Sequence, residues 1–336
     1  MKDSVELPCL SANAVMRDEV LRGLGRAAKT LSSKWLYDCR GSALFEEVTK
    51  LPAYYLTRRE TAILRDHAKQ LAGLVPPGGA FVELGSGASV KTRILLDAGA
   101  HFGAYVPVDI AAGFLVETAH TLRHRYPHIP IHPHVGDFTA PIALPSAVDG
   151  LRKVGFFPGS TIGNLPPAAA KAVLSNARQW SDVKGFILGV DLVKPEVELR
   201  AAYDDPEGRN AAFIFNALTR LNTELGATFD LSRFSYAARW DAQLAQIETQ
   251  LISTCAQTVS VAGQMITFAK DEPVTISMSR KFTHETLADL AQISGWSIAE
   301  NLTDADGGFA VAVLEPGGEL GQGASSLLRR APFLPT

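Results

Sequence analysis

The stretch FVELGSGASVKTR, Phe81–Arg93, decides the fold of this chain. An apolar run of β type breaks at Glu83, passes through the turn Gly85-Ser86-Gly87 and enters a helical pattern at once. Because glycine has no Cβ, this turn predicts backbone N–H groups and a helix N-terminus that approach a ligand closely. A dinucleotide site normally has a third glycine three residues further on, and that position is Val90 here. The turn therefore favours S-adenosylmethionine (SAM) as the ligand over a nicotinamide dinucleotide.

Apolar β-type runs alternate with helical patterns around this turn. The predicted strands are Phe81–Leu84, Ala104–Ile110, Ile129–Val135, Val154–Phe157 and Gly185–Leu192. Amphipathic helices are predicted between them, such as Thr57–Leu74 and Pro166–Gln179. The alternation predicts a doubly wound, mostly parallel α/β sheet. A helix over Glu285–Ile293 and strands over Trp296–Asn301 and Phe309–Leu314 predict a C-terminal antiparallel hairpin, which is typical of SAM-dependent methyltransferases.

The alternation stops between Lys194 and Phe282. A helix is expected over Asn210–Leu225 and strands over Gln246–Cys255 and Thr258–Phe268, and this block is too long for an ordinary connection. We therefore predict a SAM-binding domain formed by residues 57–194 and 283–316. A smaller α+β substrate or lid domain is predicted from residues 1–56 and 195–282, and a flexible tail from residues 317–336.

Composition limits the classes of protein to which the chain can belong. Its 336 residues, 46% hydrophobic with a net charge of -3, predict a globular protein with a large core and no affinity for nucleic acid. Neither a secretory signal nor a membrane-spanning run is apparent. Three distant cysteines, Cys9, Cys39 and Cys255, favour neither a disulfide framework nor a zinc site. We expect a monomer in a reducing cytoplasm that binds a small molecule.

Further segments follow one another in a specific order. They are KWLYDCRGSALFEEVTKLPAYYLTRRE, VELGSGASVKTRILL, YVPVDI, GDF, FPGSTIGNLPP, LGVDLVKP, AYDD and SMSRKF. In this order and combination the chain resembles the ergothioneine-pathway L-histidine Nα-methyltransferases, over nearly its whole length except the tail. The resemblance implies a SAM-dependent enzyme that converts free L-histidine into the trimethylated betaine hercynine.

Candidate donor-binding residues follow the ends of the first three strands. We expect Gly85, Ser86 and Gly87 to approach the methionine portion of SAM, and Lys91, on the first turn of the next helix, to pair with its carboxylate. Asp109 ends the second strand 22 residues after Gly87, where a carboxylate accepts ribose hydroxyls. The resemblance places two residues at the adenine, Asp137 as a polar contact and Phe138 as an apolar wall.

Candidate acceptor-binding residues come from the resemblance. It implies that Asn164 and Tyr203 hold the amino and carboxylate groups of the amino acid, that Tyr54 lies beside the imidazole and that Tyr37 lies near the reacting centre. Methyl transfer requires two reactants held in line and a neutral amine, whose proton a tyrosine hydroxyl or a water accepts. Without the resemblance, Asn164 is typical of a turn and the tyrosines of half-buried aromatic residues.

The predicted ring pocket departs from the family pattern. Ser277 stands where the family has a glutamate that binds the imidazole, and Thr249 stands where methionine is common, whereas Ser279 is kept. A lost charge-assisted hydrogen bond typically weakens binding by ~1.5–3 kcal/mol. We therefore expect either weaker histidine binding or a roomier pocket that prefers tryptophan, tyrosine or phenylalanine.

Two alternatives from other classes stay open. An NAD-dependent oxidoreductase would share the glycine turn and the acidic strand end, but the chain lacks the third glycine and a persuasive hydride-transfer acid. A non-catalytic SAM-binding protein would explain the altered pocket. The histidines in AHTLRHRYPHIPIHPH, Ala119–His134, favour a solvated face over a metal site, because Thr121 stands where a zinc protease has its glutamate.

Overall fold

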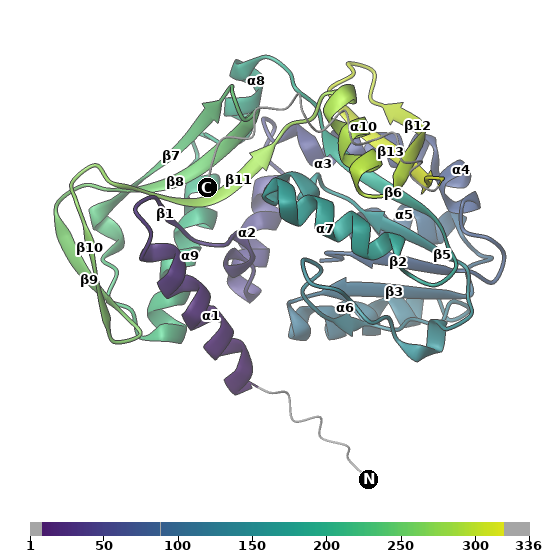
Figure 1. The fold of residues 1–336 in the computed structure, drawn as a ribbon, viewed down its shortest axis with the longest axis horizontal. Helices are drawn as coiled ribbons and strands as arrows, with labels where there is room; N and C mark the ends of the chain where they lie inside the picture. The colour runs from purple at the N-terminus through teal and green to yellow at the C-terminus, as the bar shows by residue number, and fades with distance from the viewer. Residues whose placement is uncertain (1–8, 88, 319–336) are drawn as a thin grey trace, which may run out of the picture.

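Seven strands form the larger sheet of the computed structural model, which describes residues 9–87 and 89–318 (Figure 1). Their order across the sheet is β12-β13-β6-β5-β2-β3-β4. The bounds are β2 (Ala80–Leu84), β3 (Ala104–Asp109), β4 (His134–Val135), β5 (Lys153–Phe157), β6 (Val183–Asp191), β12 (Trp296–Thr303) and β13 (Phe309–Pro316). Strands β6 to β4 are parallel, while β13 is antiparallel to β6 and to β12. The predicted doubly wound sheet with a C-terminal hairpin is confirmed.

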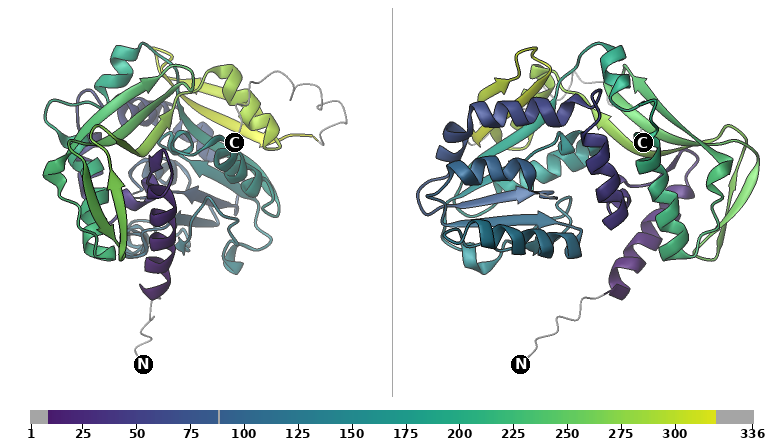
Figure 2. Two further views of the ribbon diagram at one scale, coloured as in Figure 1. Left: turned by 60° about the vertical axis from the view of Figure 1, so that its left-hand side comes forward. Right: turned by 180° about the vertical axis from the view of Figure 1, so that it is seen from behind.

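Helices cover both faces of this sheet (Figures 1 and 2). One face packs against α7 (Pro167–Arg178) and α10 (His284–Ile293), and the other against α3 (Tyr55–Asp66), α4 (Ala68–Gly73), α5 (Val90–Ala98) and α6 (Ala112–Arg125). Strand β2 is buried on both sides: Phe81 joins one apolar core and Val82 the other. Because side chains alternate along a strand, a continuous apolar run is what a doubly covered sheet requires.

A smaller sheet carries the rest of the chain. Its order is β1-β11-β8-β7, with bounds β1 (Lys29–Thr30), β11 (Pro273–Arg280), β8 (Gln246–Ser253) and β7 (Phe234–Asp241). The helices on this side are α1 (Cys9–Leu24), α2 (Cys39–Thr49), α8 (Glu196–Ala201) and α9 (Arg209–Leu225). Helix α9 packs against α2, β7 and β8. Short 3-10 turns are η1 (Ser33–Leu36), η2 (Ser146–Val148), η3 (Thr161–Asn164) and η4 (Leu231–Arg233).

The two sheets are joined where β6 and β11 end. The N–H of Phe282 donates to the carbonyl of Asp191 at 2.9 Å, and the N–H of Val193 donates to the carbonyl of Phe282 at 2.9 Å. An isolated parallel bridge between Leu192 and Phe282 results. The residues after β6 therefore lie alongside the residues after β11. The domain boundaries proposed above stay a prediction.

Three predicted elements are wrong in extent. The strand predicted over Ile129–Val135 is reduced to β4 and one bridge at Ile131, because Pro130 and Pro133 have no N–H to donate to a ladder. The strand predicted over Thr258–Phe268 is a hairpin of β9 (Gln257–Val261) and β10 (Gln264–Phe268), whose turn has positive φ at Ala262 and Gly263. The helix predicted over Thr57–Leu74 is two helices, because His67 leaves the helical region at φ -112°.

The predicted tail falls outside the described residues from 319 onward, as do residues 1–8 of the predicted lid segment. Among the residues that the structure describes, no helix has both the length and the apolar character needed to cross a bilayer.

Candidate active site

The glycine turn lies between the end of β2 and the start of α5. Gly85 and Gly87 have φ values of +66° and +46°, a left-handed backbone that glycine adopts without strain. A Cβ on Gly87 would meet no atom of the described residues within 4 Å, its chain neighbours aside. The hydroxyl of Ser86 is buried and has no hydrogen-bond partner among the residues that the structure describes. A buried hydroxyl normally has a partner, so these residues fit a ligand that approaches the turn, as SAM would.

Asp109 lies beside this turn at the end of β3. Its Oδ2 accepts the N–H of Gly87 at 2.9 Å, and its Oδ1 accepts the N–H of Ala111 at 2.9 Å. The carboxylate is therefore held in one orientation next to the glycine turn. This is the place where the sequence predicted a partner for ribose hydroxyls, and the role stays a prediction.

Lys91 lies on the first turn of α5, as predicted, but it has a protein partner. Its ammonium is paired with the carboxylate of Glu60, which is fully buried on α3. Both carboxylate oxygens of Glu60 accept the N–H of Gly159, at 2.8 and 2.9 Å. A donor carboxylate at Lys91 would therefore share the ammonium with Glu60. Sequence analysis missed Glu60, although a charged residue on the apolar face of an amphipathic helix was a signal for it.

Asp137 and Phe138 follow β4. The ring of Phe138 packs edge-on against Phe157 with centroids 5.0 Å apart, and it lies 3.4 Å from the position of a Cβ on Gly85. Asp137 forms an ion pair at 3.0 Å with Lys34 of η1. Burial raises the pKa of Asp137, but the hydrogen bonds from Thr139 and Lys34 outweigh it and the pKa lies below its ordinary value. Phe138 thus borders the glycine turn. The ion pair of Asp137 with Lys34 connects the loop after β4 to the N-terminal segment.

The three candidate tyrosines belong to one aromatic cluster. The rings of Tyr54 and Tyr203 are 6.1 Å apart, and Phe45 contacts Tyr37 and Tyr54 with centroids at 5.8 and 6.1 Å. Burial raises the pKa of Tyr37, and the negative charge of Asp109 raises it further. Burial also raises the pKa of Tyr54. Both hydroxyls therefore keep their protons at neutral pH, and the carboxylate that affects Tyr37 is the one bonded to the glycine turn.

Asn164 ends η3, which follows β5. A Cβ on Gly163 would lie 2.5 Å from the carbonyl oxygen of Arg280, so η3 packs directly on the backbone of β11. This contact brings Asn164 to the end of β11 that also contains Ser279. The ligands of open α/β sheets lie at the carboxyl ends of the strands, where the loops after β2 and β5 meet.

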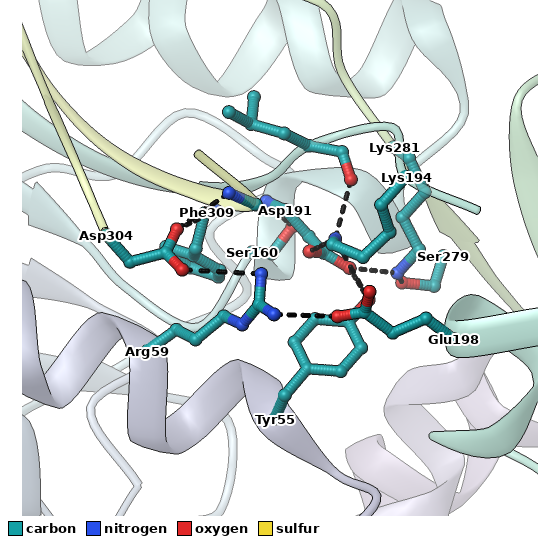
Figure 3. A network of polar contacts seen from close by, with 12 residues as sticks. Tyr55, Arg59, Ser160, Asp191, Lys194, Glu198, Ser279, Lys281, Asp304 and Phe309 are labelled. Atoms are coloured by element: carbon teal, nitrogen blue, oxygen red, sulfur yellow. Dashed lines mark hydrogen bonds and ion pairs between the residues drawn. The ribbon is translucent and has the colours of Figure 1, made fainter. Parts of the chain in front are cut away.

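A buried polar network surrounds the other acceptor candidates (Figure 3). The hydroxyl of Tyr203 donates to that of Ser279 at 2.8 Å, and Lys281 donates to both, at 2.8 and 2.9 Å. Lys281 also pairs with Asp191 at 2.7 Å. Asp191 further holds Lys194 at 2.5 Å and accepts the hydroxyl of Tyr55 at 2.9 Å. Sequence analysis missed these charged partners: Asp191 and Lys281 lie 90 residues apart, and Lys194, three residues after Asp191, gave no sign of burial on its own.

The two altered pocket residues face one another across β8 and β11. Thr249 pairs in register with Ser277, and the Thr249 hydroxyl donates to the Ser277 carbonyl at 3.4 Å. The adjacent carboxylate of Glu248 does not replace the missing one. It accepts hydrogen bonds from Gln246 and Gln250 at 2.8 and 3.0 Å, on the opposite face of the strand.

The histidine-rich segment forms no metal cluster within the described residues. The rings of His120 and His124 lie 4.7 Å apart on one face of α6, as their spacing predicted. No third histidine, cysteine or carboxylate joins them in the part of the chain that the structure describes.

Known proteins similar to this chain were found by sequence. A model of the family "Histidine-specific methyltransferase, SAM-dependent" matches residues 16–316. Histidine N-alpha-methyltransferases are 39% identical in Mycolicibacterium smegmatis and 36% identical in Mycobacterium tuberculosis, and each alignment covers 90% of this chain and 95% of the relative. A 4-dimethylallyltryptophan N-methyltransferase of Epichloe festucae var. lolii is 26% identical over 88% of this chain and 92% of its own.

Proposed function

This chain belongs to the family of histidine-specific, SAM-dependent methyltransferases, and we propose that it methylates the α-amino group of free L-histidine. The proposed product is the trimethylated betaine hercynine. Family membership makes the chain a SAM-dependent methyltransferase, and this replaces the oxidoreductase alternative. The substrate and the number of methyl groups belong to the proposal.

One observation carries the proposal: donor and acceptor candidates are neighbours. Asp137 pairs at 3.0 Å with Lys34, in the 3-10 turn η1 that ends next to Tyr37. The carboxylate of Asp109, which accepts the N–H of Gly87, raises the pKa of the Tyr37 hydroxyl. Tyr37 in turn contacts Phe45, which contacts Tyr54. A molecule bound at the glycine turn and a molecule bound at the tyrosine cluster would therefore be adjacent, which direct group transfer requires.

The proposed mechanism assigns positioning roles to this chain's residues. When bound, SAM supplies an electrophilic methyl group on a sulfonium. The proposal gives Gly85–Gly87, Lys91 and Asp109 to the donor's methionine and ribose, and Asp137 and Phe138 to its adenine. Tyr37 orients the amine through its hydroxyl and does not act as a general base. Burial raises the pKa of Tyr37, so the phenol stays protonated. The amine proton then leaves to water.

On the acceptor side the proposal uses residues around β11. Asn164 and Tyr203 hold the amino and carboxylate groups, Ser279 acts beside Tyr203, and Tyr54 borders the ring. A second candidate substrate is an aromatic amino acid other than histidine. The pairing of Thr249 with Ser277 favours it, since neither side chain offers a carboxylate to an imidazole N–H. The relative that is named for 4-dimethylallyltryptophan fits the same idea.

Mass spectrometry tests both candidates. The protein is incubated with SAM and each amino acid, and products that gain one, two or three methyl groups are identified. Methylation of histidine alone supports the first candidate and defeats the second. Absence of methylation on every amino acid would overturn both and favour a non-catalytic SAM-binding protein.

The proposed setting is a monomer in a reducing cytoplasm that binds neither nucleic acid nor membrane. Among the side chains that the structure describes, Cys39 and Cys255 are free thiols, which fits a reducing compartment. Size-exclusion chromatography with light scattering tests the monomer, and a dimer mass would contradict it.

A further inference from the structure

Lys281 is a fully buried lysine next to two acceptor candidates. It follows β11, and its ammonium lies 2.7 Å from Asp191 Oδ2, 2.8 Å from the Tyr203 hydroxyl and 2.9 Å from the Ser279 hydroxyl. An ammonium has three protons and no lone pair. All three protons of Lys281 therefore have an acceptor. Figure 3 shows Lys281 between Asp191 and Ser279.

This arrangement fixes what the two hydroxyls offer to a third group. Both must accept a hydrogen bond from Lys281, because it can only donate. One hydroxyl proton is used in the 2.8 Å bond between Tyr203 and Ser279. The second hydroxyl proton has no other acceptor within the described residues. The pair therefore presents one O–H donor, which suits an acceptor such as a carboxylate oxygen.

The charges of the network favour an anion at the same place. Lys281 and Lys194 share the single carboxylate of Asp191, and all three side chains are at most 5% exposed. Two ammonium groups and one carboxylate leave an excess of one positive charge. Burial lowers the pKa of Lys281, but Asp191 and Tyr203 outweigh it and the pKa is raised, so the ammonium keeps its charge.

We propose that Lys281 is a positioning residue for the amino acid: it fixes the Tyr203 and Ser279 hydroxyls so that one O–H points to the substrate carboxylate, and it adds positive charge beside that carboxylate. The inference rests on the proposed function. It extends the site by a residue that touches the substrate's binding partners. The plain alternative is that Lys281 only neutralises Asp191.

Two variants separate these roles. Lys281→Met removes the ammonium at similar length, and Lys194→Met is the matched control, because Lys194 is bonded to the same Asp191 but to neither Tyr203 nor Ser279. Calorimetry in the presence of S-adenosylhomocysteine measures the dissociation constant of the amino acid. We expect an increase of about 10- to 100-fold for Lys281→Met and less than about 3-fold for Lys194→Met, with similar affinity for S-adenosylhomocysteine in both. Equal effects of the two variants on amino-acid binding would overturn the inference.

A second experiment keeps Lys281 in place and so does not depend on the folding of Lys281→Met. If the pair offers one donor, Tyr203→Phe and Ser279→Ala each leave a hydroxyl that accepts from Lys281 and donates to the ligand. Each single variant should then weaken amino-acid binding by about 2- to 10-fold, and the double variant by more than the product of the two. Multiplicative effects would refute the shared donor. A wild-type protein that binds no amino acid would instead refute the proposed function.

Discussion

Replacing Ser277 with glutamate should shift the substrate preference of the enzyme toward histidine. Ser277 is half-buried and pairs in register with Thr249, so a longer side chain at this position would lie beside the predicted ring pocket. A glutamate there would accept a hydrogen bond from an imidazole N–H. Such a charge-assisted bond is worth ~1.5–3 kcal/mol, which corresponds to about 10- to 100-fold in affinity.

The new carboxylate should not be captured by the lysine network. The three protons of the Lys281 ammonium already have acceptors in Asp191, Tyr203 and Ser279, so none is left for a further ion pair. The excess positive charge at Lys281, Lys194 and Asp191 still favours the ionised form of the glutamate. Ser277→Glu therefore adds a negative charge that remains available to the ligand.

The assay compares kcat/KM for histidine and for phenylalanine in the wild type, Ser277→Glu and Ser277→Gln. Glutamine has the size of glutamate without its charge, so it separates electrostatics from volume. We expect the ratio of kcat/KM for histidine to kcat/KM for phenylalanine to rise about 10-fold or more in the glutamate variant only. An equal rise for glutamine, or no rise for glutamate, would refute the assignment of this position to the ring pocket.

Three further changes test other parts of the site. Asp109→Asn leaves one acceptor oxygen where two N–H groups now bind, so calorimetry should show SAM affinity weakened about 10-fold or more with the melting temperature little changed. Gly189→Ala should lower the free energy of unfolding by about 1–3 kcal/mol in thermal melts, because its Cβ would lie 2.1 Å from Glu60 Oε1; an unchanged melt would contradict this packing. Burial raises the pKa of Glu83 to about 7, so the stability that this carboxyl contributes in its protonated form is lost as pH rises through that value. Glu83→Gln should therefore raise the melting temperature more at about pH 8 than at about pH 5, and equal shifts would count against a buried charge.

Much of the larger sheet could be predicted from sequence because its signals are local. A fully buried parallel strand such as β2 is a continuous apolar run, and the glycine turn follows it directly. The errors arose where backbone chemistry opposed the apolar pattern. Pro130 and Pro133 interrupt a run that looks like a strand, and Ala262 adopts a left-handed conformation that alanine seldom adopts.

The site was predictable where a residue type has an expected chemical role, such as an aspartate at a strand end. It was not predictable where function depends on contacts between distant segments. Glu60 reaches Gly159, and Asp191 reaches Lys281, across 99 and 90 residues of sequence. No periodicity or spacing encodes such a pair. The sequence identified residues that would face a ligand, and the structure adds the buried partners that orient them.

Asp191 has a consequence for protein engineering. Its backbone belongs to the larger sheet, while its side chain is bonded to Lys281 and Lys194, which the predicted boundaries assign to different domains. A chimera that transplants residues 195–282 onto another methyltransferase core would leave Lys281 without its counter-charge. Grafting residues 195–282 therefore requires moving Asp191 together with them. Hybrids joined near residue 194 should be insoluble unless the recipient protein supplies an aspartate at the matching strand end.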